Sequence, residues 1–408
     1  MATRPPAQTV SLCGAPREAG GAFGTANAAD IAAAVDAFLS GEFSRDELLH
    51  STERYRALVA ELAPHWLAEA EAIATAAGVA ADDYLAYQGA KYRKINLPEC
   101  FTYYAAPRHT AGGVTLFHKN RDNTNRPQCA YVKGIAGCYR FATTADTMDL
   151  GCMMAVNERG LCCAADTGYP DPNPCCRGMM NPDIMRLLLE QCSDVAEALA
   201  LLQELEGKRA YAGAAIGTNW MFTDAAGNGM QVCHYHGKIE VNTSDEGFQV
   251  MRPDARGQMV LEAFRPAAGG IRPALLNQLS RQSPILADSN ISAMTASVPA
   301  MRPDLFSRAE FAVHNAGRVV YVPLYLGITS TPEPLLNGTI YRLAEMGTIP
   351  VEKLGEFEKG LHEQCGRLEL AARDALAKRG EEAARRTLTL GCARFAGDAV
   401  RFLSESEA

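Results

Sequence analysis

The stretch that decides the fold reads Leu97-Pro98-Glu99-Cys100-Phe101-Thr102-Tyr103-Tyr104-Ala105-Ala106. Pro98 ends any helix that approaches from the N-terminal side before it reaches Cys100. Aromatic and β-branched residues then favour a strand over Phe101–Ala106. Cys100 therefore lies at the boundary between two parts of the chain that differ in secondary structure.

The part before this boundary is helical in pattern. An alanine-rich run from Thr25 to Leu39 ends before Gly41, and Ser44-Arg45-Asp46-Glu47 has the spacing of a capping box at the start of a second helix. Pro64 begins another helix, and a shorter helical segment follows over residues 81–91.

The part after the boundary is rich in strand pairs separated by turn residues. The pairs are Phe101–Ala106 with Val114–His118, Cys152–Val156 with Leu161–Ala165, Trp220–Thr223 with Met230–His234, and Phe311–His314 with Arg318–Leu326. One helix is expected over residues 182–205, and charged amphipathic helix returns from about Val351. Helices and strands without strict alternation predict an α+β layered architecture.

Composition and charge exclude several classes of protein. The chain has 408 residues, a formal net charge of −8 and 48% hydrophobic residues, with no block of like charges, so neither nucleic acid nor an anionic membrane is an expected partner. The apolar run over residues 72–81 is far short of the roughly 18 residues that a membrane span needs. Because residues 1–14 lack the layout of a signal peptide, a cytoplasmic location is expected.

The thirteen cysteines do not form a recognisable framework. Their number is odd and no Cys-x-x-Cys motif occurs, which argues against a small disulfide scaffold and against a zinc ribbon. In a reducing compartment most of these thiols are interpreted as small buried hydrophobic groups. Cys100 is the exception that the surrounding sequence singles out.

Cys100 is well placed to act as a nucleophile if the chain is cut just before it. Cleavage would free an α-amino group on the nucleophilic residue itself, with a pKa of about 7.7. No separate histidine would then be needed as a base. The segment Phe117-His118-Lys119-Asn120-Arg121-Asp122 ends the neighbouring predicted strand, which brings Asp122 to the same end as the thiol.

These motifs resemble a known family. Cys-x-Thr at Cys100, the turn Thr110-Ala111-Gly112-Gly113 and Lys119-Asn120-x-Asp122 are similar to the self-processing cysteine N-terminal-nucleophile (Ntn) hydrolases typified by isopenicillin N acyltransferase. Upstream, Gly14-x-Pro16-x-Glu18-x-Gly20 with Gly24, and Asp82-Asp83-Tyr84-Leu85 before the cysteine, are similar to that family as well. The matches run over roughly residues 12–345 in the family's order.

The resemblance implies a four-layer αββα sandwich and self-cleavage between Glu99 and Cys100 through an N-to-S acyl shift. Residues 1–99 would form the small chain, residues 100–350 the catalytic core, and residues 351–408 a helical extension packed on the core.

Functional residues carry over from the family by position. Cys100 matches the nucleophile, Thr102 a hydroxyl needed for processing, and Asp122 the catalytic aspartate. Ser307-Arg308 matches the family's Ser-Arg pair, so Arg308 is expected to contact the substrate or Asp122, with Ser307 beside the substrate.

The sequence departs from the family pattern at three places. The expected Thr-Asn-His segment, which supplies the oxyanion donor, is replaced by Met251-Arg252-Pro253-Asp254, and Asn219 is the substitute candidate. Phe101 replaces a hydroxyl residue, and Arg121, expected to bind substrate, replaces a smaller or apolar one.

The predicted activity is hydrolysis of a linear amide, or transfer of its acyl group to an amine, through an acyl-thioester on Cys100. The expected partners are a small-molecule amide and, as co-substrate, an amine or acyl-CoA; no cofactor is expected, and homo-oligomer formation stays open. The alternatives are a dipeptidase or peptide amidase of the wider superfamily, a degenerate member that only binds a ligand, and a non-catalytic metal-binding or redox protein. The metal-binding alternative would use Cys233, His234 and His236, whereas the main prediction includes no metal ligands.

Overall fold

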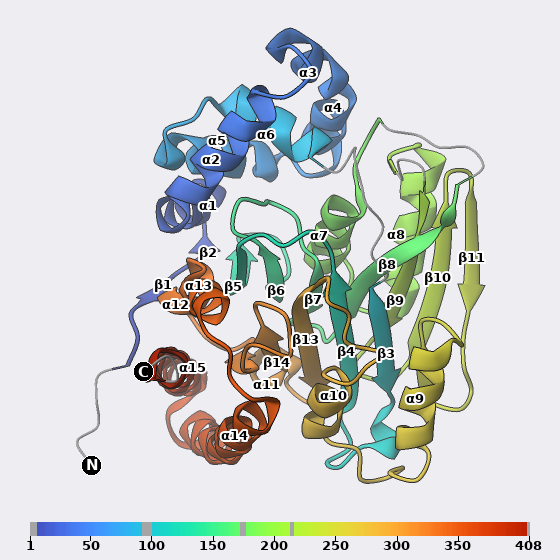
Figure 1. Ribbon diagram of the computed structural model, residues 1–408, viewed down its shortest axis with the longest axis vertical. Coiled ribbons are helices and arrows are strands. Elements are labelled where there is room, and N and C mark those ends of the chain that lie inside the picture. Colours follow the sequence, from blue (N-terminus) through green and yellow to red (C-terminus); the bar gives the residue numbers. More distant parts are fainter. Residues whose placement is uncertain (1–5, 92–99, 172–176, 213–215, 406–408) are drawn as a thin grey trace.

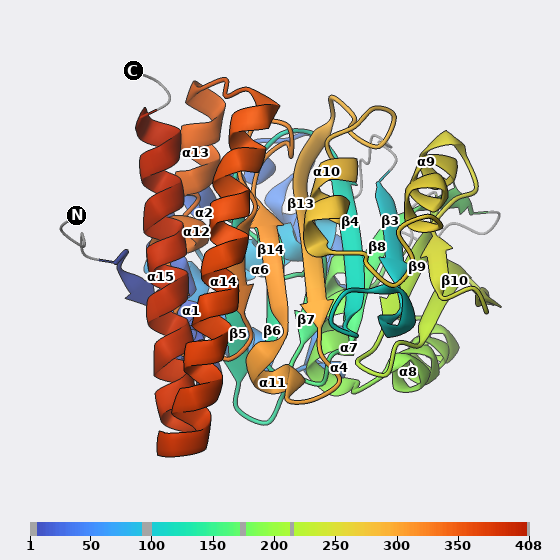
Figure 2. The ribbon, with the colours of Figure 1, turned by 90° about the horizontal axis from the view of Figure 1, so that it is seen from below.

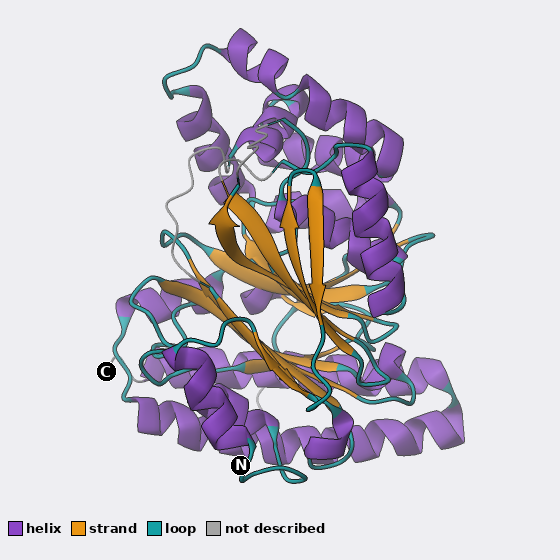
Figure 3. Ribbon diagram, turned by 90° about the vertical axis from the view of Figure 1, so that its right-hand side faces the viewer, coloured by secondary structure: helices purple, strands orange, loops and turns teal. Residues whose placement is uncertain are grey.

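The computed structural model describes residues 6–91, 100–171, 177–212 and 216–405. Two β-sheets pack face to face, and helices cover the outer face of each sheet (Figure 3). The predicted α+β class and the αββα order of layers are therefore confirmed. Among the described residues, no helix combines the length and the apolar character that a membrane span requires.

The N-terminal part is helical, as predicted, and caps one end of the molecule (Figure 1). Its helices are α1 (Pro16–Ala26), α2 (Ala28–Leu39), α3 (Arg45–Ser51), α4 (Glu53–Leu62), α5 (His65–Ala77) and α6 (Ala81–Ala90). The capping box is confirmed, because the Ser44 side chain accepts a hydrogen bond from the Glu47 backbone N–H and the Glu47 carboxylate accepts one from the Ser44 backbone N–H. The helix expected over Thr25–Leu39 is wrong at its start, since Asn27 separates α1 from α2.

The first sheet lies beneath these helices and beneath α7 (Asn181–Gln191) and α8 (Val195–Gly207). Within the described residues it contains β11 (Lys238–Asn242), β10 (Gly229–Tyr235), β9 (Ile216–Thr223), β8 (Cys162–Pro170), β7 (Met154–Asn157), β6 (Phe141–Asp146), β5 (Gln128–Ile135) and β2 (Cys13–Gly14), in that spatial order. Neighbouring strands are antiparallel except β2 and β5, which are parallel.

The second sheet is entirely antiparallel and contains β12 (Phe248–Val250), β3 (Phe101–Ala105), β4 (Thr115–Asp122), β13 (Asn290–Val298), β14 (Arg308–Ala312) and β15 (Val322–Tyr325). Its outer face is covered by α9 (Ala255–Phe264), α10 (Pro273–Leu279), α14 (Val351–Arg379) and α15 (Glu381–Glu405) (Figure 2). The connecting elements are η1 (Pro107–His109), α11 (Pro303–Phe306), α12 (Glu333–Leu336), α13 (Thr339–Met346) and the paired short strands β1 (Thr9–Val10) and β16 (Thr331–Pro332).

The predicted strand pairs are confirmed as β3 with β4, β7 with β8, β9 with β10 and β14 with β15. The single helix expected over residues 182–205 is wrong, because the chain breaks it into α7 and α8. Asp194 causes the break by capping α8, where its carboxylate accepts hydrogen bonds from the Ala196 and Glu197 backbone N–H groups at 3.0 Å.

The first sheet separates the core into two apolar clusters, and the alternation of side chains along β8 shows this division. Cys162 and Ala164 belong to the apolar cluster that fills the space between the sheets, whereas Cys163 and Ala165 belong to the cluster under the helices. Asp166 follows in the same alternation and points between the sheets, where it meets side chains of the second sheet. A polar group is thereby introduced at one end of an otherwise apolar interior.

Candidate active site

Cys100 lies directly before β3, next to the last residues of β4. Phe101 pairs with Asn120 across these strands, so Cys100 is adjacent to the end of β4, where Asp122 lies. The Cys100 thiol is buried, with 8% of the residue exposed, and its Sγ donates to the Asp122 carbonyl oxygen over 3.7 Å. The structure therefore brings Cys100 and Asp122 together, as the hairpin pattern predicts.

The surroundings of the Cys100 thiol favour its protonated form. Burial raises the pKa of Cys100, and the carboxylates of Asp166 and Asp122 raise it further, against the opposing effect of the Lys119 ammonium. A thiol in this state needs a base that removes its proton before it can attack a carbonyl carbon. Among the described residues that line the pocket there is no histidine to act as this base, so an α-amino group freed on Cys100 is the candidate that the sequence offers.

Asp122 ends β4 and lies opposite Asn290 on β13. Its carboxylate is buried, and its Oδ1 accepts a hydrogen bond of 3.2 Å from Asn290 Nδ2. Burial raises the pKa of Asp122 to about 6, although the bond from Asn290 opposes the shift. The carboxyl group is therefore ionised at neutral pH and protonated in mild acid.

A buried group of three residues joins the two sheets beside the thiol. Thr102 on β3 donates its hydroxyl hydrogen to Asp166 Oδ1 over 2.7 Å, and Lys119 on β4 donates from Nζ to the same oxygen over 2.9 Å and to the Ala165 carbonyl oxygen. Burial opposes the charge of Lys119, but Asp166 outweighs burial and raises the lysine pKa. Asp166 Oδ2 is buried and has no hydrogen-bond partner among the described residues.

A pocket opens above these groups, between the ends of the strands and α7. Its lining includes the polar side chains of Cys100, Lys119, Asp122 and Asp166. It also includes an apolar group, formed by Met153, Met180, Pro182, Met185 and Ile216. The pocket therefore combines a thiol and charged groups with apolar surface, which suits a reaction on a polar bond that carries an apolar substituent.

Arg121 lines the same pocket, but its charge is already paired. Its guanidinium forms a bidentate ion pair with the Asp146 carboxylate, at 2.6 Å and 3.3 Å, and donates to Gln128 Oε1 over 2.7 Å. Burial opposes ionisation of Asp146, yet Arg121 and Arg126 outweigh it and hold the Asp146 pKa far below its usual range. Its predicted role in substrate binding stays a prediction, with Asp146 as its main partner in this structure.

The prediction that Arg308 meets Asp122 is wrong. Arg308 on β14 pairs with Ser297 on β13, and Ser297 pairs with Leu116 on β4. Leu116 precedes Asp122 by six residues of the strand, so Arg308 is displaced from Asp122 by about 20 Å along the strand direction. It is also on the far side of β13 and forms an ion pair of 2.9 Å with Glu310 on its own strand. The Ser-Arg motif predicts the start of a strand, but it does not predict at which end of the sheet that strand starts.

Ser307 and Asn219 are likewise absent from the pocket lining in the part of the chain that the structure describes. Ser307 directly precedes Arg308 at the start of β14. Asn219 on β9 pairs with Asp166 on β8, and its Nδ2 donates to the Thr167 carbonyl oxygen over 3.3 Å. Asn219 is thus the cross-strand partner of a residue that lines the pocket, and its role as the oxyanion donor stays a prediction.

Cys233, His234 and His236 do not form a metal site in the described chain. His234 Nε2 is 2.8 Å from Glu206 Oε2, and its ring stacks on Tyr211 with ring centres 4.0 Å apart. Among the described residues, the side-chain donors that come together as a candidate metal group are elsewhere, at His65, Cys138 and Glu190.

Glu99, expected on the acyl side of the cleaved bond, lies outside the described residues.

Sequence reasoning missed the roles of Lys119, Asp166 and Asn290. Lys119 was visible in the polar end of β4, but a lysine there is most often solvated. Asp166 and Asn290 reach the site from β8 and β13, whose positions beside Cys100 depend on sheet order and sheet packing rather than on any local motif.

The chain was compared with solved structures, curated sequences and family models. Solved structures similar to this chain include penicillin V acylase from Agrobacterium tumefaciens, with 12% identity and a TM-score of 0.39 over 55% of this chain and 85% of that one. An N-acylethanolamine-hydrolyzing acid amidase orthologue from Caenorhabditis elegans has 10% identity and a TM-score of 0.36, over 50% and 94%. A variant of conjugated bile acid hydrolase from Clostridium perfringens has 12% identity and a TM-score of 0.34, over 51% and 88%.

No curated protein sequence matches the chain. The sequence model of one family, described as acyl-coenzyme A:6-aminopenicillanic acid acyl-transferase, matches residues 109–250. The matched stretch begins after Cys100 and contains Lys119, Asp122 and Asp166. The predicted resemblance is thereby confirmed, and over residues 109–250 this chain is similar to the acyl-coenzyme A:6-aminopenicillanic acid acyl-transferase family.

Proposed function

We propose that the chain is a self-processing cysteine amidohydrolase or acyltransferase with Cys100 as its nucleophile. The observation that carries the proposal is the position of Cys100 Sγ, which lines a pocket at the start of a central strand beside the buried carboxylates of Asp122 and Asp166. The match to an acyl-transfer family over residues 109–250 supports an enzyme that acts on amide bonds.

Self-processing is the first step of the proposal. The Cys100 thiol adds to the carbonyl carbon of Glu99, the C–N bond to the Cys100 nitrogen breaks, and the acyl group moves to sulfur as a thioester. Water then hydrolyses the thioester, which leaves a carboxylate on Glu99, a free thiol and an α-amino group on Cys100. Thr102 supports this step by its hydroxyl bond to Asp166, which fixes the strand residue two positions after the nucleophile.

The new α-amino group supplies a base that is attached to the nucleophile itself. It takes the thiol proton as sulfur attacks the substrate carbonyl, and it returns that proton to the departing amine when the tetrahedral intermediate collapses. The resulting acyl-thioester passes to water in hydrolysis or to a second amine in acyl transfer. In its protonated form the amino group is stabilised by Asp122 and by the unpartnered Oδ2 of Asp166, whose charges favour a nearby ammonium.

The substrate is a linear amide with an apolar acyl part. Methionine side chains are flexible and polarisable, so the wall of Met153, Met180 and Met185 suits an acyl chain of variable shape. Lys119 and the carboxylates line the same pocket and would contact the amide and its leaving amine.

The test is an activity screen with matched variants. Purified protein is incubated with N-acyl amines, with dipeptides and with acyl-CoA plus an amine, and products are identified by liquid chromatography with mass spectrometry. We expect cleavage of an N-acyl amine, and a rate lower by about 10⁴-fold or more for Cys100→Ala, because the nucleophile is gone. Cys233→Ala, which removes another buried thiol, is the control and should retain activity.

Two outcomes would redirect the proposal. Cleavage of dipeptides alone would favour the dipeptidase alternative. Equal activity in the wild type and in Cys100→Ala would contradict a thioester at this residue.

A further inference from the structure

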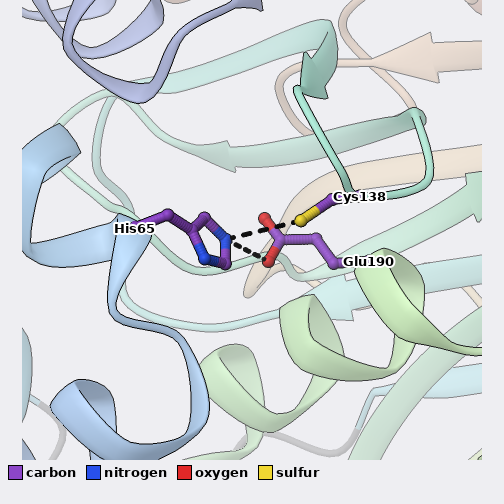
Figure 4. A group of neighbouring side chains, drawn as sticks. All are labelled: His65, Cys138 and Glu190. Carbon is purple, nitrogen blue, oxygen red and sulfur yellow. Dashed lines mark hydrogen bonds and ion pairs between the residues drawn. The ribbon is translucent and has the colours of Figure 1, made fainter.

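His65, Cys138 and Glu190 form a second cluster of reactive side chains, and it lies outside the pocket of Cys100 (Figure 4). His65 begins α5, Cys138 lies in the turn between β5 and β6, and Glu190 lies in the last turn of α7. Segments far apart in the sequence thus direct an imidazole, a thiol and a carboxylate toward one point.

The distances within the cluster are close to those of a metal site. His65 Nε2 is 2.9 Å from Glu190 Oε2 and 3.7 Å from Cys138 Sγ, and one donor atom from each residue lies within 4.8 Å of the others. Tetrahedral zinc with bonds of about 2.0–2.3 Å places its ligand atoms roughly 3.3–3.8 Å apart. The sulfur–nitrogen separation already fits, and the nitrogen–oxygen pair needs to open by roughly 0.5 Å.

The residues behind the cluster hold its ligands in place. Glu190 Oε1 accepts from Arg186 Nε over 2.8 Å, and Glu190 Oε2 accepts from Trp66 Nε1 over 2.9 Å. The Tyr139 backbone N–H donates to the Glu190 carbonyl oxygen over 2.9 Å, which ties the turn that carries Cys138 to α7. Such outer contacts orient metal ligands and reduce the cost of assembling the site.

The cluster is open to solvent on one side. Glu190 is buried, the His65 side chain is 22% exposed, and Cys138 is partly exposed. An ion can therefore enter from solvent, and water can occupy a fourth position.

We propose that His65, Cys138 and Glu190 bind a single divalent cation of the zinc class. One imidazole, one thiolate and one carboxylate are a donor set that zinc accepts, and the sulfur disfavours the hard cations Mg²⁺ and Ca²⁺. Binding leaves His65 neutral with its proton on Nδ1, and it releases to solvent the Cys138 thiol proton together with the Nε2 proton of a charged His65. The metal takes the place of the hydrogen bond between His65 and Glu190.

The bound ion would join the N-terminal helices to the sheet. His65 comes from the helical part, whereas Cys138 and Glu190 come from the part after Cys100, so the site bridges the two (Figure 1). If the chain splits at Cys100, a consequence that rests on the proposed function, the ion would also link the two products.

Zinc binding is tested in the Cys100→Ala protein, so that the proposed nucleophile cannot contribute and the result is independent of self-processing. Protein freed of metal is dialysed against buffered micromolar Zn²⁺ and analysed by inductively coupled plasma mass spectrometry. We expect about one zinc per chain, and a loss of affinity of about 10-fold or more when His65→Ala or Cys138→Ala is added. Cys233→Ala, added instead, should leave zinc binding unchanged.

Cobalt provides a readout that a loss of folding would not imitate. Co²⁺ bound at the site should give a sulfur-to-metal charge-transfer band that disappears in Cys138→Ala, while that variant keeps a cooperative thermal transition. The absence of bound zinc in the parent protein would overturn the proposal, and so would zinc bound equally well after Cys138→Ala. Loss of zinc in Cys233→Ala but not in Cys138→Ala would also overturn it, because the zinc would then be bound by the cluster on β10 that contains Cys233.

Discussion

Cys100 and Cys163 are both buried thiols associated with central strands, but their neighbours differ. Cys163 lies in the apolar cluster beneath the helices, where burial holds its pKa well above the usual range. Cys100 faces a pocket with Lys119, Asp122 and Asp166 around it. At the scale of single residues, the charged groups near a thiol distinguish a nucleophile from a packing residue.

Asp122 predicts an acid limit to activity. Because burial raises its pKa to about 6, the carboxylate is ionised above that pH and loses its charge below it, and the α-ammonium of Cys100 then loses a partner. Protonation of the α-amino base lowers kcat/KM first, and we expect the loss of the Asp122 charge to add a second, steeper fall with a midpoint near pH 6. Asp122→Asn should remove this second fall while lowering kcat/KM by about 10²–10⁴-fold. A pH–rate profile checks both, and a second fall that stays in Asp122→Asn would contradict the assignment.

The buried pair of Lys119 and Asp166 predicts non-additive stability. Lys119→Met leaves Asp166 buried without its cation and should cost about 3–5 kcal/mol of unfolding free energy. The double variant with Asp166→Asn removes both charges and should lose less than the sum of the two single losses. Urea unfolding measures this cycle, and strict additivity would show that the two groups do not interact.

Residue roles could be predicted only where a local pattern specifies geometry. The proximity of Cys100 and Asp122 follows from one hairpin, whose register is set by a short turn. Arg308 was misplaced because its distance from that hairpin depends on β13, which lies between β4 and β14 and which no turn motif joins to either of them. Asp166 could not be predicted at the site, because only the packing of two sheets brings it there.

At the scale of elements, α1 and α5 cross closely because α1 offers glycines at the contact. A Cβ on Gly24 would lie 2.7 Å from the Ile73 carbonyl oxygen, and one on Gly20 would collide with the backbone of Glu69. This packing positions the helix that carries His65 and Glu69. The sequence indicated both glycines through a motif, but the motif alone did not identify the partner helix.

The crossing predicts opposite effects for two glycines of α1. Gly24→Ala should lower the free energy of unfolding by about 1–3 kcal/mol, because the added methyl group forces the helices apart. Gly21→Ala, where nothing lies within 4 Å of the new Cβ, should be neutral or stabilise by up to about 1 kcal/mol through helix propensity. Chemical denaturation distinguishes them; equal effects would argue against close helix contact as the cause.

The boundaries of helices were harder to predict from hydrophobic periodicity than their presence. The expected helix over residues 182–205 has continuous apolar periodicity, but Asp194 caps a new helix within it and competes with continuation of the first. The strand pairs were predicted correctly because each joins neighbours in sequence. The order in which the pairs form two sheets was not, because it depends on contacts over long separations.

At the scale of the whole molecule, a buried ionic network connects the N-terminal helices to the first sheet. Glu69 on α5 is bound by Lys133 on β5, at 2.5 Å, and by Arg186 on α7. Burial alone would raise the pKa of Glu69, but Arg186 and Lys133 outweigh burial and lower it to about 2. The association of these layers therefore depends on the charge of a residue without solvent access.

This network predicts how acid destabilises the protein. Since the folded-state pKa of Glu69 lies below its usual value of 4.5, its contribution is present above pH 4.5 and is lost as the pH falls toward 2. Glu69→Gln should cost about 3–5 kcal/mol at neutral pH and weaken the acid dependence of unfolding. Glu71→Gln, on the same helix as Glu69, removes an exposed ion pair with Arg17 of α1 and should change stability by about 1 kcal/mol or less. Equal losses in both variants would contradict the special position of Glu69.

Intact-mass spectrometry of the purified protein under denaturing conditions tests the central claim most directly, because it reports whether Cys100 becomes an N-terminal residue. The account predicts two products in the wild type, with the masses of residues 1–99 and 100–408, and one full-length chain in Cys100→Ala. A wild-type protein that stays a single full-length chain under native conditions would contradict it.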